Sequence, residues 1–313
     1  MSKPNSKTSD PVYIFLAFFV LAEFLGVVLV NTLASLPSDP TGWFLNTTGD
    51  ISDKYDVAIT PAGWAFSIWS VIYIWQAIWI IYVIVNIFRT NKFGKVYMNP
   101  PLVPPVFLAS YSVNLVLNIA WLFCFDREYI PVAFGVLALI AFSAYVCLFI
   151  SYRAVSRHID QLWEHHRLDL WLNSIFIQNG ILIYATWCSI ATLLNFSMVL
   201  TYWANVEERI ACLICLSILA AELVLYFLVD IFFLEYHLRS AFMVYPVVIW
   251  ASTAVLVNNW DPNSSVSIFT AVIVGLASAA FVVKQIKSIM TCCCRKDQKT
   301  DASKEKMSME NVA

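Results

Sequence analysis

Aromatic and hydrogen-bonding side chains recur at helical spacing in the apolar stretch TPAGWAFSIWSVIYIWQAIWIIY, residues 60–82. Phe66, Trp69, Tyr73 and Gln76 occupy positions i, i+3, i+7 and i+10, which share one face of a helix. Such a face offers ring surface for stacking on a flat hydrophobic molecule and an amide that could orient it. Two further tryptophans lie off this stripe and are expected to face lipid or the membrane interface: Trp75 and Trp79.

Two later apolar segments carry comparable stripes. The first contains Asn114, Asn118, Trp121 and Phe125, and the second contains Gly180, Tyr184, Trp187, Ala191 and Asn195. Amide side chains inside a membrane need hydrogen-bonding partners, so these faces are expected to point into a bundle. Any one stripe could simply hold two helices together. Three stripes that each combine Trp with amide or hydroxyl groups favour the wall of a cavity.

Carboxylates also occur inside apolar segments, at Glu23, Glu222 and Asp230. Carboxylates within a membrane are costly and usually serve ion or proton pathways, so Glu23 and Glu222 are candidates for proton coupling. The alternative is a protonated Glu that donates a hydrogen bond to a neighbouring helix. The eight cysteines show no metal-binding pattern with histidine, and we expect neither a metal nor a cofactor.

The composition places these side chains in a membrane. The chain is 60% hydrophobic and 13% charged, which excludes an ordinary soluble domain, and no basic face indicates nucleic acid. Mostly apolar runs of about 20 residues, the length that spans a bilayer as a helix, recur along the chain. We therefore predict an all-α, polytopic membrane helical bundle with eight transmembrane helices near 11–33, 62–88, 104–125, 130–152, 170–195, 209–233, 238–258 and 267–290.

Charge predicts the orientation of the bundle. With the N-terminus in the cytosol, 16 Lys and Arg residues fall on the cytosolic side and three on the other, so both termini are expected to be cytosolic. A cleaved signal peptide, leaving seven helices, is the alternative for the first span. Glycosylation sequons at Asn46 and Asn263 would then lie outside the cytosol, which suits the plasma membrane or an endomembrane. Cys292, Cys293 and Cys294 follow the last span beside Arg295 and are candidates for palmitoylation. The polar tail beyond them is expected to be disordered.

Three of these segments carry a family resemblance. PAGWAFSIWSVIY at 61–73 resembles the second-helix signature of the TspO/MBR family, the tryptophan-rich sensory proteins and translocator proteins. LNIAW at 117–121 and YATWCSIATLLN at 184–195 are similar to its third- and fifth-helix signatures. The departures are Ala62 and Ile183, where the family usually has proline, and a sterol-associated motif that is incomplete after Tyr202.

The resemblance implies a five-helix bundle over 11–200 with a pocket that opens towards the loop between its first two helices, here residues 34–60. Family members bind porphyrins, sterols and synthetic ligands, and the mitochondrial outer membrane is a further location by analogy. Residues 1–10 would be a cytosolic N-terminus, 201–290 three additional helices, and 291–313 a cytosolic tail. The ligand-binding residues that the resemblance and the stripes imply are Pro61, Trp64, Phe66, Trp69, Tyr73, Asn118, Trp121, Tyr184, Trp187, Ala191 and Asn195.

These patterns predict a non-enzymatic membrane protein that binds a flat hydrophobic ligand, tetrapyrrole- or sterol-like, with a transport or sensory role. Its expected partners are membrane lipid and that ligand, and a homo-oligomer is compatible with the sequence. One alternative is a proton-coupled secondary transporter that uses Glu222 and Glu23. Another is a membrane enzyme acting on a tetrapyrrole, for which the cavity stripes offer only Tyr73, Tyr184 and Cys188 as reactive groups.

Overall fold

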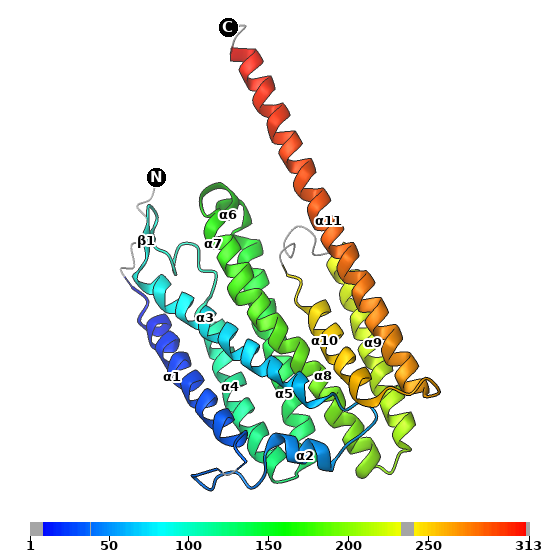
Figure 1. Ribbon diagram of the computed structural model, residues 1–313. Coiled ribbons are helices and arrows are strands. Elements are labelled where there is room, and N and C mark those ends of the chain that lie inside the picture. The colour runs from blue at the N-terminus through cyan, green and yellow to red at the C-terminus, as the bar shows by residue number, and fades with distance from the viewer. Residues whose placement is uncertain (1–8, 38, 233–240, 311–313) are drawn as a thin grey trace.

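The computed structural model describes residues 9–37, 39–232 and 241–310, with side chains in the last range described to residue 290. Long helices dominate the described chain (Figure 1). The helices are α1 (Pro11–Ala34), α2 (Thr48–Lys54), α3 (Ile68–Phe88), α4 (Pro105–Asp126), α5 (Ile130–Arg157), α6 (Ile159–His165), α7 (Arg167–Leu172), α8 (Asn179–Tyr202), α9 (Glu208–Phe232), α10 (Val244–Asn259) and α11 (Ser265–Glu310). A 3₁₀ turn, η1 (Gly63–Ser67), leads into α3, and a π-helical segment, η2 (Asn173–Gln178), leads into α8. The two short strands β1 (Thr90–Asn91) and β2 (Gly94–Lys95) form a hairpin after α3.

The expected all-α membrane bundle is confirmed. Within the described ranges, seven helical segments are long and apolar enough to cross a membrane. The expected span at 238–258 is shorter than predicted: α10 begins only at Val244 and has 16 residues. That length corresponds to about 24 Å, less than the ~30 Å hydrocarbon core. The apolar run starts only after Arg239 and Ser240, which accounts for the late start.

The helices run alternately up and down, and α10 lies beside α8 and α11 although it is short (Figure 1). α1 therefore begins at the same end of the bundle as that from which α11 projects. α2 lies at the opposite end, which we call the α2 end. α11 continues to Glu310, so the disordered tail expected from composition is wrong for these residues. Residues 291–310 contain no Gly or Pro. They include Lys, Glu, Gln and Met, which favour helices, so the helix can continue.

Local sequence explains several helix ends. The Asp10 side chain accepts from the backbone N–H groups of Val12 and Tyr13, which caps α1, and Pro11 occupies its first turn. A capping box formed by Thr47 and Asp50 starts α2. These signals set where elements begin, while packing decides which faces meet.

A buried amide joins α3, α4 and α8. Gln76 Nε2 donates to the Gly180 carbonyl at 2.8 Å, and the Tyr111 hydroxyl donates to Gln76 Oε1 at 3.0 Å. Trp79 also donates to Gln76 and is fully buried, so the expected lipid-facing position of Trp79 is wrong. Trp75, half-buried, donates to the Ile175 carbonyl at 3.0 Å. A Cβ on Gly180 would lie 2.7 Å from Trp75 Cδ1, so the close approach of α3 and α8 requires glycine there.

Candidate functional site

A cavity lies in the α2 half of the bundle and encloses about 70 Å³. One side of it is aromatic, with Phe66 from η1, Trp69 from α3, Trp121 and Phe125 from α4, and Trp187 from α8. The rings meet mostly edge to face: Trp69 and Trp187 have centroids 6.4 Å apart at 89°, and Phe66 and Trp187 are 6.2 Å apart at 90°. Trp121 instead stacks on Phe125 at 5.0 Å. The aromatic stripes therefore do converge on one hollow space.

Several polar atoms of the cavity wall have no hydrogen-bonding partner in the structure. They are the indole N–H groups of Trp121 and Trp187, the amide oxygen of Asn195 and the hydroxyl of Ser52. All four residues are more than nine-tenths buried. A buried polar group without a partner costs about 1–3 kcal/mol, which water or a bound molecule would recover. The cavity wall thus contains two unsatisfied indole donors, an amide acceptor and a hydroxyl that can donate or accept.

The structure separates the sequence-predicted residues into two groups. Seven line the cavity: Pro61, Phe66, Trp69, Trp121, Trp187, Ala191 and Asn195. Tyr73, Asn118 and Tyr184 are not among the lining residues. Asn31 donates to Asn118 at 2.9 Å, and Asn118 donates to the Tyr184 hydroxyl at 3.4 Å, which links α1, α4 and α8.

Tyr73 and Trp64 support the wall from outside. Tyr73 stacks on Trp69, with centroids 5.7 Å apart and an interplanar angle of 21°. Trp64 packs edge-on against Trp250 of α10 at 4.8 Å and remains 44% exposed. Tyr73 therefore positions the Trp69 ring, and Trp64 positions the segment before α3. Neither residue lines the cavity.

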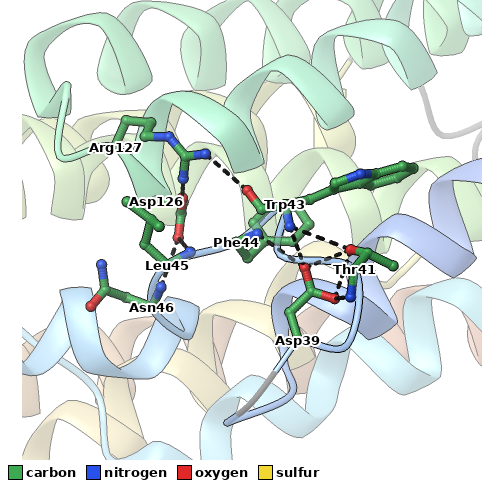
Figure 2. Close-up of polar contacts among 8 residues, drawn as sticks. All are labelled: Asp39, Thr41, Trp43, Phe44, Leu45, Asn46, Asp126 and Arg127. Atoms are coloured by element: carbon green, nitrogen blue, oxygen red, sulfur yellow. Dashed lines mark hydrogen bonds and ion pairs between the residues drawn. The ribbon is translucent and has the colours of Figure 1, made fainter.

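The loop between α1 and α3 covers the α2 end of the cavity, as the length and polarity of residues 34–60 suggest. Thr48 and Ser52 of α2 contribute to the lining. Figure 2 shows how the preceding segment is held: Asp126 Oδ1 accepts from the backbone N–H groups of Leu45 and Asn46, each at 2.9 Å. Arg127 pairs with Asp126 and donates to the Trp43 carbonyl at 2.9 Å. We call this loop, residues 34–60, the cover. The end of α4 therefore fastens the cover to the bundle.

A tight turn shapes the start of that cover. The Asp39 carboxylate accepts from the backbone N–H groups of Thr41, Trp43 and Phe44 (Figure 2). Partial burial of Asp39 opposes these hydrogen bonds, but together they hold its pKa below the ordinary value. Asp39 stays ionised and ordered in the loop near neutral pH.

The intramembrane carboxylates lie away from the cavity. Glu222 is exposed on the outer face of α9, and Glu23 of α1 is half-buried with one carboxylate oxygen unpartnered. Asp230 is buried and forms an ion pair with Lys284 of α11, and it accepts from the Tyr245 hydroxyl of α10 at 3.1 Å. Sequence reasoning did not identify this pair, although opposite charges near the same end of two spans, α9 and α11, could have indicated it.

Sequence reasoning also missed the far side of the cavity. Residues of α9, α10 and α11 complete the wall: Cys215, Leu216, Leu219, Ala251, Ser252, Val255 and Thr270. These side chains are small or aliphatic and carry no distinctive signature, so their spacing alone could not place them at a site.

The proposed modification sites lie outside the cavity. Asn263 is exposed in the turn between α10 and α11, and Asn46 is half-buried beside the Asp126 anchor. The side chains of Cys292, Cys293 and Cys294 lie outside those that the structure describes. Glycosylation and palmitoylation therefore stay predictions.

Comparisons with known proteins give a family but no individual relative. No curated protein and no solved structure matches the chain. A family model described as TSPO-like protein matches residues 17–283, from the second turn of α1 into α11. The match thus continues beyond residue 200, through the three helices that follow the five-helix region. A match over most of its length shows that the chain belongs to the TSPO-like protein family.

Proposed function

We propose that this membrane protein binds a flat hydrophobic molecule in the aromatic cavity and transports it or senses its presence. The observation that carries the proposal is the set of buried indole rings whose N–H groups at Trp121 and Trp187 lack partners beside a hollow space. Ring stacking would contribute about 0.5–1.5 kcal/mol per ring pair beyond burial. Tetrapyrrole- and sterol-like molecules are the candidates that the family suggests.

The size of the cavity constrains how such a ligand enters. About 70 Å³ is well below the roughly 300–1,000 Å³ of a typical ligand pocket and is too small for a macrocycle. Binding therefore requires the cavity to widen. The cover that carries α2 is the natural moving part because it is held to α4 mainly by Asp126 and Arg127.

Quenching of tryptophan fluorescence by an uncharged porphyrin, with its carboxyl groups esterified, tests the binding function. We expect Trp69→Phe and Trp187→Phe in purified protein to weaken binding, because each keeps a ring but loses area and the indole N–H. Ala191→Leu should block the cavity from α8. Trp75→Phe is the matched control on α3, since Trp75 does not line the cavity. If all three cavity variants bind as the parent does, the aromatic stripes only pack helices.

We infer from charge that both termini are cytosolic, which puts the α2 end on the extracellular or lumenal side. In that orientation the exposed Asn263 would be open to glycosylation, and the cysteines after residue 291 would meet cytosolic acyltransferases. Loss of palmitate labelling when Cys292, Cys293 and Cys294 are all changed to Ser would support the acylation.

A further inference from the structure

The cavity has a second wall that differs in chemistry from the first. It is formed by Leu216 and Leu219 of α9, Ala251, Ser252 and Val255 of α10, and Thr270 of α11. All six side chains are buried, and none carries a ring. Ala251, Ser252 and Val255 occupy positions i, i+1 and i+4, so the three side chains face the same way along α10. We call these six residues the aliphatic wall.

We propose that α9, α10 and α11 are part of the ligand site. The aliphatic wall contacts the aliphatic portion of an uncharged ligand. The ring system of that ligand lies on the aromatic wall, formed by Phe66, Trp69, Trp121, Phe125 and Trp187. This inference rests on the binding function proposed above. It gives the three helices beyond residue 200 a direct role in choosing the ligand, through the size and shape of the aliphatic wall.

Hydrogen bonds fix the aliphatic wall relative to the aromatic one. The Ala62 N–H donates to the Ala254 carbonyl of α10 at 3.1 Å, and Trp250 Nε1 donates to the Ala65 carbonyl at 3.1 Å. Asn259 Nδ2 donates to the Thr60 carbonyl at 2.7 Å. α10 is thus tied along its length to the segment that delivers Phe66 and Trp69. The two walls form one rigid enclosure at this side, and the spacing between them is part of the fold.

Two further hydrogen bonds, from α8 and α9, hold the part of the cover that follows α2. Glu208, at the start of α9, accepts from the Ala58 N–H at 2.8 Å. The Tyr202 hydroxyl at the end of α8 donates to the Asp56 carbonyl at 2.8 Å. The segment after α2 is therefore held by α8 and α9, while the segment before α2 is held by α4.

Charge argues for an uncharged ligand. The residues that line the cavity include no Asp, Glu, Lys or Arg. The connecting segments at the α2 end carry three basic residues, Lys54, Arg127 and Arg209. The same segments carry three times as many acidic ones, Asp39, Asp50, Asp53, Asp56, Asp126, Glu128, Glu207, Glu208 and Asp261. A carboxylate ligand would lose its hydration inside and meet repulsion at the mouth. A neutral polycyclic molecule with an aliphatic side chain meets neither cost.

Photolabelling tests which wall each part of a ligand touches. Two sterol probes would be used on the purified full-length protein in nanodiscs, one with a diazirine in the ring system and one with a diazirine in the aliphatic side chain. We expect the side-chain probe to label peptides of α9–α11 and the ring probe to label α3, α4 and α8, both competed by excess sterol. Competable labelling confined to α1–α8 for both probes would overturn the assignment. If a porphyrin dicarboxylate binds saturably and neither sterol probe gives competable labelling, the claim that the ligand is uncharged is wrong.

Occlusion from each wall separates this inference from the binding function itself. Ala251→Leu should weaken probe binding about tenfold, which corresponds to about 1.4 kcal/mol, because the larger side chain occupies space that the ligand needs. Ala277→Leu is the matched control, since Ala277 of α11 is equally buried but does not line the cavity. Equal weakening by Ala277→Leu would mean general overpacking and would contradict the inference.

The pattern of the two occluding variants decides between the claims. If Ala191→Leu loses binding and Ala251→Leu does not, the protein binds a ligand in the cavity but the aliphatic wall is not part of the ligand site. If both variants bind as the parent does and have the same thermal stability, the proposed binding in the cavity is contradicted as well.

Discussion

A buried ion pair joins α9 and α11 outside the cavity. Asp230 is 1% exposed and Lys284 5% exposed, and Tyr245 donates to the same carboxylate. The three residues come from α9, α10 and α11, so the pair fixes how these helices stand relative to one another. Since α9–α11 also line the cavity, the pair supports the site from a distance.

Removing one partner of this pair is expected to be costly. Lys284→Met removes the ion pair of the buried Asp230 carboxylate and should lower the free energy of unfolding by about 3–5 kcal/mol. Asp230→Asn should also lower it, and the double variant should lose less than the sum of the two, because each single change removes the same ion pair. Thermal unfolding in detergent measures both, with Glu222→Gln on the exposed face of α9 as control. Strict additivity of the two single changes would show that the pair does not interact energetically.

A second ion pair, at the α2 end, gives a pH-dependent prediction. Glu128 accepts from Lys54 Nζ at 2.6 Å and from the Tyr55 hydroxyl at 2.8 Å. These hydrogen bonds, led by that from Lys54, lower the pKa of Glu128. A lowered pKa means stabilisation that is present above the ordinary glutamate pKa and is lost as pH falls through the folded value.

Acidification through that range should therefore loosen the end of α2. Hydrogen exchange of the peptide around residues 50–58 is expected to quicken as pH falls, after correction for intrinsic exchange. In Glu128→Gln the peptide should exchange faster at neutral pH and show a smaller acid-dependent change. Identical pH profiles in parent and variant would mean that other carboxylates control the cover.

At the scale of elements, the cover between α1 and α3 is held on both sides of α2, by α4 before it and by α8 and α9 after it. Asp126, 5% exposed at the end of α4, accepts from two consecutive backbone N–H groups (Figure 2). Hydrogen bonds to a charged group are each worth about 1.5–3 kcal/mol. We expect release of this anchor to let the cover open while the helices stay packed, as entry of a ligand larger than the cavity would need.

Asp126→Ala should release this anchor. We expect faster hydrogen exchange at residues 43–47 and faster ligand dissociation, with little change in the exchange of α4 and α5. Asp126→Asn keeps an acceptor and should fall between the parent and the alanine variant. Unaltered exchange at 43–47 in the alanine variant would show that the cover is held elsewhere.

At the scale of the whole molecule, the number of passes sets the sidedness of the ends. α1 starts and α11 leaves at the same end of the bundle (Figure 1). Tags added at residues 2 and 313 should therefore respond alike, and the charge asymmetry predicts that both stay protected in unpermeabilised cells. Labelling of only the N-terminal tag would indicate an odd number of crossings, and loss of that tag from the mature protein would indicate a processed first span.

The sequence by itself determined the class of fold, the positions of most spans and the residues of the aromatic wall. These features are local: apolar length makes a span, and helical spacing places Phe66, Trp69, Trp121 and Trp187 on inward faces. Hydropathy could not establish that α10 is short, because apolar residues of the preceding loop extended the apparent span.

Only the tertiary structure decided which inward groups face the hollow space. Tyr184 and Asn118 satisfy each other and Asn31, while Trp79 turns inward to Gln76 and Asn195 reaches the cavity with its oxygen unpartnered. The aliphatic wall was invisible for a related reason. In a membrane, lipid is as apolar as the bundle interior, so an aliphatic side chain carries no mark of the side it faces. Its place at the cavity emerges only when α9 and α10 pack against α8, and α11 packs against α9 and α10.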